Sequence, residues 1–183
     1  MYVAGWGKRD ISQSLLLYGE YEPYETEIIK KLIKRGMIVV DIGANCGYYT
    51  LLMAKLVGSK GKVFSFEPES FNYSLLIKNI KINGFTNVSP IQQAVSNKCE
   101  KTKLFIDRSN LGGSSFSEDN VTQKKDGMMI QTTTLDNFFK KFGGKVDFIK
   151  IDTQGAEGLI INGARRILKN NNLIIIMEFG PYG

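Results

Sequence analysis

Five short apolar runs, separated by segments with helical periodicity, constrain the fold of this chain more than any other feature. The runs are MIVVDIG, KVFSFEP, NVSPIQQAVS, VDFIKID and LIIIMEF. Strands that alternate with helices pair in parallel through right-handed crossovers, and the helices then cover both faces of the sheet. Within the first and last runs, MIVV and LIIIM are continuously apolar, as expected for strands covered on both faces. The pattern predicts an α/β fold with a doubly wound, mostly parallel sheet in three layers, α/β/α.

A helix is expected before the first strand, at residues 24–35. Further helices are expected between the strands, at residues 48–58, 68–82, 135–142 and 156–169. Pro68 is expected to open the helix 68–82, because the first turn of a helix tolerates the missing N–H. That helix should end at Asn83-Gly84, a C-cap signal. Periodicity predicts which side chains the helices 68–82 and 156–169 direct toward the core. They are Phe71, Leu75, Leu76, Ile80, Leu159, Ile160, Ala164, Ile167 and Leu168.

The length of 183 residues suits a single domain. We divide it into an N-terminal segment and helix at 1–35, a first half at 36–96, an insert at 97–134 and a second half at 135–183. The insert breaks the strand–helix rhythm. It has two short strand candidates, KLFID and MIQTTT, around a polar segment that we interpret as a loop.

Composition excludes several classes of site. The chain has no histidine, which excludes histidine-containing catalytic triads and histidine-ligated metals. The net charge of +6 comes from scattered lysines, which favours a solvated surface and a small-molecule partner over nucleic acid. No apolar run reaches the length of a membrane helix. Cys46 and Cys99 have no metal-binding spacing, so a reducing cytoplasm is the expected compartment.

Polar residues end all five predicted strands. In chain order they are Asp41, Glu67, Gln93 with Ala94, Asp152 and Glu178. In a doubly wound sheet the carboxyl ends of the strands form one edge, and ligands bind there near the point where the strand order reverses. These side chains are therefore the candidates for a binding site.

Glu67 follows Gly47 by 20 residues. A carboxylate in this place can accept both hydroxyls of a ribose; the alternative is an acid that caps the next helix. The loop DIGANCGYYT has a Gly43-x-Asn45-x-Gly47 pattern instead of GxGxxG, and Tyr48 replaces the third glycine. Asparagine tolerates a left-handed turn, but the pattern suits an adenosine with a small zwitterion better than one with a diphosphate.

The order and spacing of several motifs resemble the FkbM-type family of S-adenosylmethionine-dependent methyltransferases. The motifs are DIGANCGYYT, FEPESFNYSLLIKNIKING, AVS, LGGSS, TTLDNF, VDFIKIDTQGAEGLIINGARRIL and IIIMEF. The resemblance runs from about Ile11 to Phe179. It implies a Rossmann-like class I methyltransferase fold, with S-adenosyl-L-methionine held by the half at 36–96.

The resemblance also implies roles for individual residues. It assigns the turn at Asp41, Gly43, Ala44, Asn45 and Gly47 to the methionine end of the cofactor, with Ala44 and Cys46 as small residues packed in the turn. The ribose would contact Glu67 and Pro68, and the adenine would be bordered by Gln93, Ala94 and Val95. Asp152 would lie at the mouth of the reaction site. Gly113, Ser114, Ser115 and Gln154 are the candidates for contacting the methyl acceptor.

A hydroxyl acceptor needs a group that takes its proton. The candidates are Asp152, Glu178, Lys150 and a tyrosine, with Glu157 better explained as a helix-start acid. Because Asp152 and Glu178 end neighbouring strands, they could share a proton or bind a hard cation such as Mg²⁺. The alternative is that Asp152 orients loops or the cofactor amine and Glu178 caps local backbone. Lys150 shares the face of Asp152 and is interpreted as its electrostatic partner.

The family's architecture is similar to a seven-stranded sheet that closes with a hairpin after the fifth strand. The present chain stops shortly after LIIIMEF, so we expect a domain that lacks this hairpin. Another region, the insert or a second copy in a homo-oligomer would then cover the exposed strand. The resemblance favours O-methylation of a small polar acceptor such as a sugar or secondary metabolite. An NAD(P)-binding oxidoreductase and a non-catalytic module that docks a partner are the alternatives.

Overall fold

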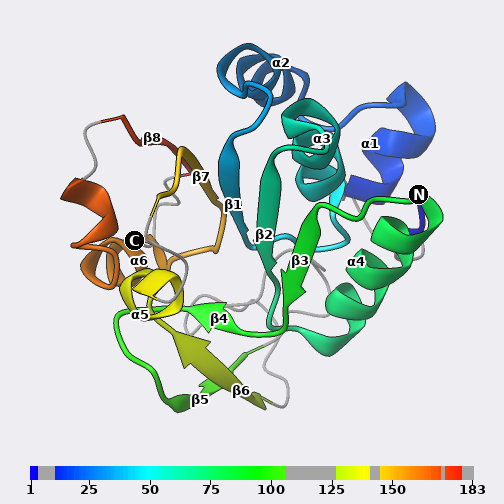
Figure 1. Ribbon diagram of the computed structural model, residues 1–183. Coiled ribbons are helices and arrows are strands. Elements are labelled where there is room, and N and C mark those ends of the chain that lie inside the picture. Colours follow the sequence, from blue (N-terminus) through cyan, green and yellow to red (C-terminus); the bar gives the residue numbers. More distant parts are fainter. Residues whose placement is uncertain (4–10, 106–126, 141–144, 170–171, 179–183) are drawn as a thin grey trace.

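The computed structural model describes residues 1–3, 11–105, 127–140, 145–169 and 172–178. Its centre is a five-stranded sheet in the order β3-β2-β1-β7-β8 (Figure 1). The four pairings between these strands are parallel. The strands are β1 Ile38–Ile42, β2 Lys62–Phe66, β3 Val88–Ile91, β7 Phe148–Ile151 and β8 Ile174–Met177. The predicted doubly wound α/β fold is confirmed.

Helices cover the sheet on both faces. On one face α2 Pro23–Leu32, α3 Tyr48–Val57 and α4 Ser70–Ile82 pack through Ile29, Met53 and Leu76 on Val39 of β1. The other face buries Val40 of β1 under α5 Leu135–Phe139 and α6 Glu157–Asn162. Successive strand residues point to opposite faces, so alternate residues of β1 belong to different cores. The short helix α1 Ile11–Tyr18 was not predicted from the sequence.

The insert contributes a small second sheet. Its strands are β4 Ala94–Val95, β5 Lys101–Leu104 and β6 Met128–Thr133, with β6 parallel to β4 and antiparallel to β5. The predicted third strand is therefore divided, because β3 joins the main sheet while β4 pairs with β6. The Thr132 hydroxyl contacts the backbone of Lys98 and Glu100, which fixes the turn into β5.

The start of α4 differs from the sequence prediction. Pro68 does not open the helix; Glu69 is its N-cap, and its carboxylate accepts the N–H groups of Phe71 and Asn72 at 2.9 and 2.7 Å. A carboxylate at this position satisfies otherwise unpaired amides. Phe71 lies in the first turn and is exposed, so its predicted place in the core is wrong. The predicted stop at Asn83-Gly84 is confirmed, with Gly84 at φ +67°.

The predicted helix 156–169 is interrupted. After α6 the chain turns at Gly163 and resumes as a 3₁₀ helix at Ile167–Lys169. A Cβ on Gly163 would lie 2.2 Å from the carbonyl oxygen of Ser96, so the backbone approaches the small sheet more closely than a side chain permits. The Asp136 carboxylate accepts the next free amides, of Arg166 and Ile167. Leu159, expected inward, is exposed.

The strand order reverses between β1 and β7. From β1 the chain moves outward to β2 and β3, and it later returns to the other side of β1 as β7. Loops at the carboxyl ends of β1 and β7 therefore diverge to opposite sides and leave room for a ligand. Among the described helices, none has the length and apolarity that a membrane span requires.

Candidate functional site

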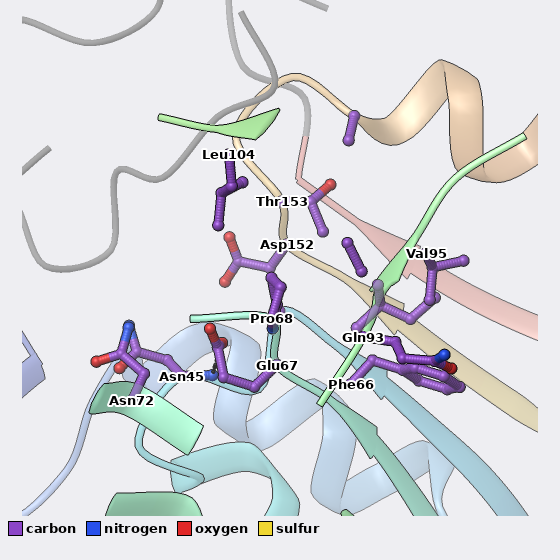
Figure 2. Close-up of a pocket in the computed structure, with 14 residues that line it drawn as sticks. Asn45, Phe66, Glu67, Pro68, Asn72, Gln93, Val95, Leu104, Asp152 and Thr153 are labelled. Carbon is purple, nitrogen blue, oxygen red and sulfur yellow. Dashed lines mark hydrogen bonds between the residues drawn. The ribbon is translucent and has the colours of Figure 1, made fainter. Parts of the chain in front are cut away.

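A cleft of about 590 Å³, counted to its open mouth, lies at the carboxyl ends of β1, β2 and β7. In Figure 2, Asp152 lies above Glu67, with Asn45 and Asn72 to one side and Gln93 to the other. Eight residues singled out from the sequence line it: Gly43, Asn45, Glu67, Pro68, Gln93, Ala94, Val95 and Asp152.

The turn after β1 has the left-handed backbone that its sequence suggested. Gly43, Asn45 and Gly47 have φ of +83°, +50° and +96°. A Cβ on Gly43 would lie 1.9 Å from the carbonyl oxygen of Asp152, and one on Gly47 would lie 2.7 Å from Leu76. Glycine at 43 thus lets the β1 turn touch the end of β7, which forms the floor of the cleft.

Glu67 is a buried carboxylate at the centre of this cleft. Its Oε2 accepts the N–H of Asn45 at 2.8 Å, and its Oε1 accepts the N–H of Glu69 at 2.9 Å. Burial raises the pKa of Glu67 to about 7, although these two N–H bonds act to lower it. Each carboxylate oxygen can accept about two hydrogen bonds, and one N–H uses only one of them. The group can therefore still accept hydrogen bonds from a ligand.

Six further residues of the cleft wall were not identified from the sequence. They are Ile42, Phe66, Asn72, Leu104, Thr153 and Ala156. Phe66 directly precedes Glu67, and Thr153 directly follows Asp152. Their position next to predicted site residues could have identified them. Asn72 lies one helical turn beyond Glu69, and Leu104 belongs to the small sheet. Nothing local in the sequence indicates that these last two residues reach the cleft.

Three residues assigned to the cofactor turn do not line the cleft. Ala44 is buried and Gly47 is the N-cap of α3. Asp41 is buried beside α3, where its Oδ2 accepts the Thr50 hydroxyl at 2.6 Å. Its Oδ1 has no hydrogen-bond partner within the described chain. Burial raises the pKa of Asp41, against the opposing charge of Lys150. Asp41 alternates with Ile42 along β1, which places it on the face away from the cleft.

Lys150 is a buried cation next to Asp152. Its Nζ lies 2.8 Å from Asp152 Oδ2 and 4.4 Å from the centre of the Tyr49 ring. Burial acts to lower the pKa of Lys150, but the carboxylates of Asp152 and Asp41 outweigh it and hold the pKa above its ordinary value. The ammonium therefore stays charged and fixes the Asp152 side chain, as the sequence interpretation expected.

Asp152 and Glu178 directly follow neighbouring strands, because β7 pairs with β8. Burial would raise the pKa of Asp152, but Lys150 and hydrogen bonds from Glu178 and Gln154 keep it below its ordinary value. The hydrogen bond with Asp152, followed by burial and the Asp152 charge, raises the pKa of Glu178 to about 7. The two carboxyls therefore titrate together, and the raised pKa of Glu178 lets the pair exchange a proton near neutral pH.

The loop that carries Asp152 is held by Glu157. This buried carboxylate accepts the hydroxyl of Thr153 at 2.9 Å and the N–H of Gly155 at 3.0 and 3.1 Å. Its oxygens are thus engaged with the loop backbone, consistent with a helix-start role. Gln154 has a left-handed φ of +53° and is exposed outside the cleft.

Two further predictions concern residues that contact the methyl acceptor and a possible metal ion. Gly113, Ser114 and Ser115 lie outside the described residues. The described residues contain no group of three or more acidic or thiol side chains arranged to hold a metal ion. Asp152 and Glu178 are a pair of carboxyls at the ends of the neighbouring strands β7 and β8.

Comparisons with known proteins identify the family and the fold of this chain. A sequence profile described as Methyltransferase FkbM domain matches residues 41–182. A protein-L-isoaspartate O-methyltransferase of Methanothrix thermoacetophila is 36% identical over 59 residues, which are 32% of this chain and 28% of that protein. A tRNA(Phe) (4-demethylwyosine(37)-C(7)) aminocarboxypropyltransferase of Methanocaldococcus jannaschii is 32% identical over 106 residues, 57% of this chain and 40% of that protein. The chain spans about a third of the length of the first three curated relatives.

A solved structure supports the fold. The FkbM methyltransferase of Methylobacillus flagellatus KT superposes with a TM-score of 0.56 at 15% identity, over 83% of this chain and 39% of that one. At this identity the similarity concerns the fold alone. The profile match spans well over half of the chain and includes the β1 turn, Glu67 and the Asp152 loop. The chain belongs to the FkbM family of methyltransferases.

Proposed function

We propose that this domain transfers a methyl group from S-adenosyl-L-methionine to a hydroxyl of a small polar acceptor. The observation that carries the proposal is the buried Glu67 carboxylate, held between two backbone amides at the centre of the cleft. Burying a carboxylate that opens only onto a cleft is costly unless a ligand supplies further donors. The two vicinal hydroxyls of a ribose are such donors.

The remaining walls fit the other parts of the cofactor. Gly43 and Asn45 form a left-handed turn in the cleft wall just before the N-terminus of α3, and their own amides already donate to Phe66 and Glu67. The positive end of the α3 dipole suits a carboxylate nearby. Phe66, Val95 and Leu104 provide apolar surface that suits an adenine ring, with the Gln93 amide at its edge. Bound S-adenosyl-L-methionine would supply an electrophilic methyl group on a sulfonium.

The Asp152–Glu178 pair is the proposed proton acceptor. As the methyl–sulfur bond breaks and the new bond to the acceptor oxygen forms, the hydroxyl proton has to leave. An ionised pair can take that proton, and Lys150 then keeps the charge on Asp152 stable. A divalent cation at the pair is not needed for this role. The sugar-like acceptor rests on the family resemblance, and the reducing cytoplasm is the compartment we propose with it.

Ligand binding tests the proposal directly. Isothermal titration calorimetry should show saturable binding of S-adenosylhomocysteine, and thermal shift should show stabilisation by it and not by NADH. Glu67→Ala removes the acceptor of the ribose hydroxyls. Because hydrogen bonds to a charged group each contribute about 1.5–3 kcal/mol, the affinity should fall at least about tenfold.

The matched control is Glu27→Gln, an exposed carboxylate on α2 that pairs with Lys30. It should bind S-adenosylhomocysteine as the unchanged protein does. A folded sample without any heat of binding would refute the cofactor assignment. Stabilisation by NADH instead would favour an oxidoreductase, and indifference to both ligands would favour a docking module.

A further inference from the structure

A second cavity lies on the other side of Asp152 from the cofactor cleft. It has a volume of about 730 Å³ to its open mouth and is enclosed by α2 and the ends of β7 and β8. Asp152 lines both spaces. The cleft is bordered by Ile42 from the α5–α6 face, whereas the cavity is bordered by Ile29 and Ile176 from the face under α2–α4 and by Ile151 and Met177 from the α5–α6 face. Glu178 borders the cavity and does not line the cleft.

The cavity has an apolar floor and a charged rim. Its floor consists of Ile28, Ile29, Ile151, Ile176 and Met177. Four carboxyl groups stand around it, those of Glu22, Glu25, Asp152 and Glu178, against the single ammonium of Lys150. This concentration of acids contrasts with the net charge of +6 of the whole chain. Because Lys150 is already paired with Asp152 at 2.8 Å, it leaves little positive potential for an anion.

Glu22 is held at this rim by a strained backbone. It has φ +43° and ψ 72°, and as the N-cap of α2 it makes no side-chain capping hydrogen bond. Its Oε2 instead accepts the Tyr49 hydroxyl at 2.7 Å, and the Tyr49 ring lies under the Lys150 ammonium. A non-glycine residue in this region costs of order 1–3 kcal/mol, and such strain concentrates at functional sites. The result is a continuous chain of contacts from Glu22 through Tyr49 and Lys150 to Asp152.

We propose that this cavity is the acceptor site, and that Glu22 and Glu25 make it selective for a hydroxylated acceptor with a positively charged amine, such as an amino sugar. The inference rests on the proposed function for the methyl donor. The apolar floor fits the carbon face of a sugar ring, and the rim carboxylates fit its hydroxyls and ammonium. An organic cation suits the rim better than a metal ion, since the described carboxyls form no metal-binding group of three. Anionic acceptors such as sugar phosphates are excluded by the same charges.

Three probes that share a hexose ring and differ in charge test the charge preference. Glucosamine, its neutral N-acetyl derivative and glucose 6-phosphate are titrated at about pH 7 into the protein, with and without saturating S-adenosylhomocysteine. Glucosamine should bind about tenfold more tightly than the N-acetyl derivative, and glucose 6-phosphate should bind weakest. Equal binding of all three, tightest binding of the phosphate, or binding of none would overturn the inference.

The double variant Glu22→Gln, Glu25→Gln tests the location. Its glucosamine affinity should fall about tenfold while its affinity for S-adenosylhomocysteine stays within about twofold, because neither residue lines the cofactor cleft. The control Glu27→Gln removes an acid from the same helix without touching the cavity and should change neither affinity. If S-adenosylhomocysteine fails to bind while the glucosamine preference persists, the methyl-transfer proposal falls and the cavity assignment stands. If the double variant keeps its glucosamine affinity, the cavity assignment is wrong.

Discussion

At the scale of single residues, the site depends on carboxyl groups whose proton affinity is set by their surroundings. Glu67 and Glu178 have pKa values raised to about 7, the first mainly by burial and the second mainly by its hydrogen bond with Asp152. Asp152 keeps a depressed pKa because Lys150 contacts it. Carboxyl groups within one site thus differ in proton affinity, with Asp152 charged and Glu67 and Glu178 able to exchange a proton near neutral pH.

The first prediction concerns the carboxyl pair. A ¹³C NMR titration should give Glu178 a midpoint of about 7 in the unchanged protein. In the Asp152→Asn variant that midpoint should fall toward the ordinary value of 4.5, because the neighbouring negative charge is removed. An unshifted Glu178 in the unchanged protein would contradict the pairing. Full turnover of both Asp152→Asn and Glu178→Gln on an identified acceptor would contradict the proton-acceptor role.

At the scale of elements, the cleft exists because two loops approach each other without side chains between them. The turn after β1 reaches the end of β7 at Gly43, and the Asp152 loop is tied to the start of α6 by Glu157. The small sheet contacts α6 at Gly163 in the same way. Close backbone approaches of this kind fix the positions of Glu67 and Asp152 relative to each other.

The second prediction compares two glycines with similar backbone conformations. Gly43 and Gly84 have φ of +83° and +67°, but only at Gly43 would a Cβ collide, at 1.9 Å from the Asp152 carbonyl oxygen. Gly84→Ala should lower the free energy of unfolding by about 1 kcal/mol through backbone strain alone. Gly43→Ala should lower it by at least about 3 kcal/mol and weaken S-adenosylhomocysteine binding. Urea unfolding measures both, and equal losses would show that the turn can move away from β7.

At the scale of the whole molecule, the site adds a pH-dependent cost to folding. Asp41, Glu67 and Glu178 all have pKa values above their ordinary values in the folded protein. Each is therefore protonated more readily folded than unfolded. Between pH values of about 4.5 and 7 the unfolded chain binds fewer protons at these positions, so stability decreases as pH rises. The shifts of Asp152 and Lys150 act outside this interval, since the first is lowered from 3.8 and the second raised from 10.5.

The third prediction is that the domain is less stable at a pH of about 8 than at about 5. For Glu67 alone, a pKa raised from 4.5 to about 7 corresponds to a difference of up to about 3 kcal/mol. Urea unfolding at the two pH values measures it, and Glu67→Ala should flatten the dependence. Stability that is constant or increases over this interval would show that these carboxyls are hydrated in the folded protein.

Local patterns in the sequence predicted the strands, most helices and the core of the site. Glu67 and the Gly43 turn could be identified because a strand end followed by a glycine loop is a local signal. One error had a distant cause and another a local one. The break at Gly163 depends on the backbone of Ser96, and the late start of α4 depends on capping by Glu69. Leu104 and Asn72 could not be assigned, because only packing brings them to the cleft.

The sequence by itself determined that this chain forms a doubly wound sheet with acids at its carboxyl edge. The spacing of apolar residues and the turn residues specify strands, helices and turns through interactions between residues a few positions apart. Only the tertiary structure decided which face each acid occupies. It buried Asp41 away from the cleft, placed Asp152 between two cavities and brought Glu22 to the second of them. The physical reason is that the pairing of β1 with β7 and the packing of α2 on the sheet join residues more than 100 positions apart. No local pattern records such contacts.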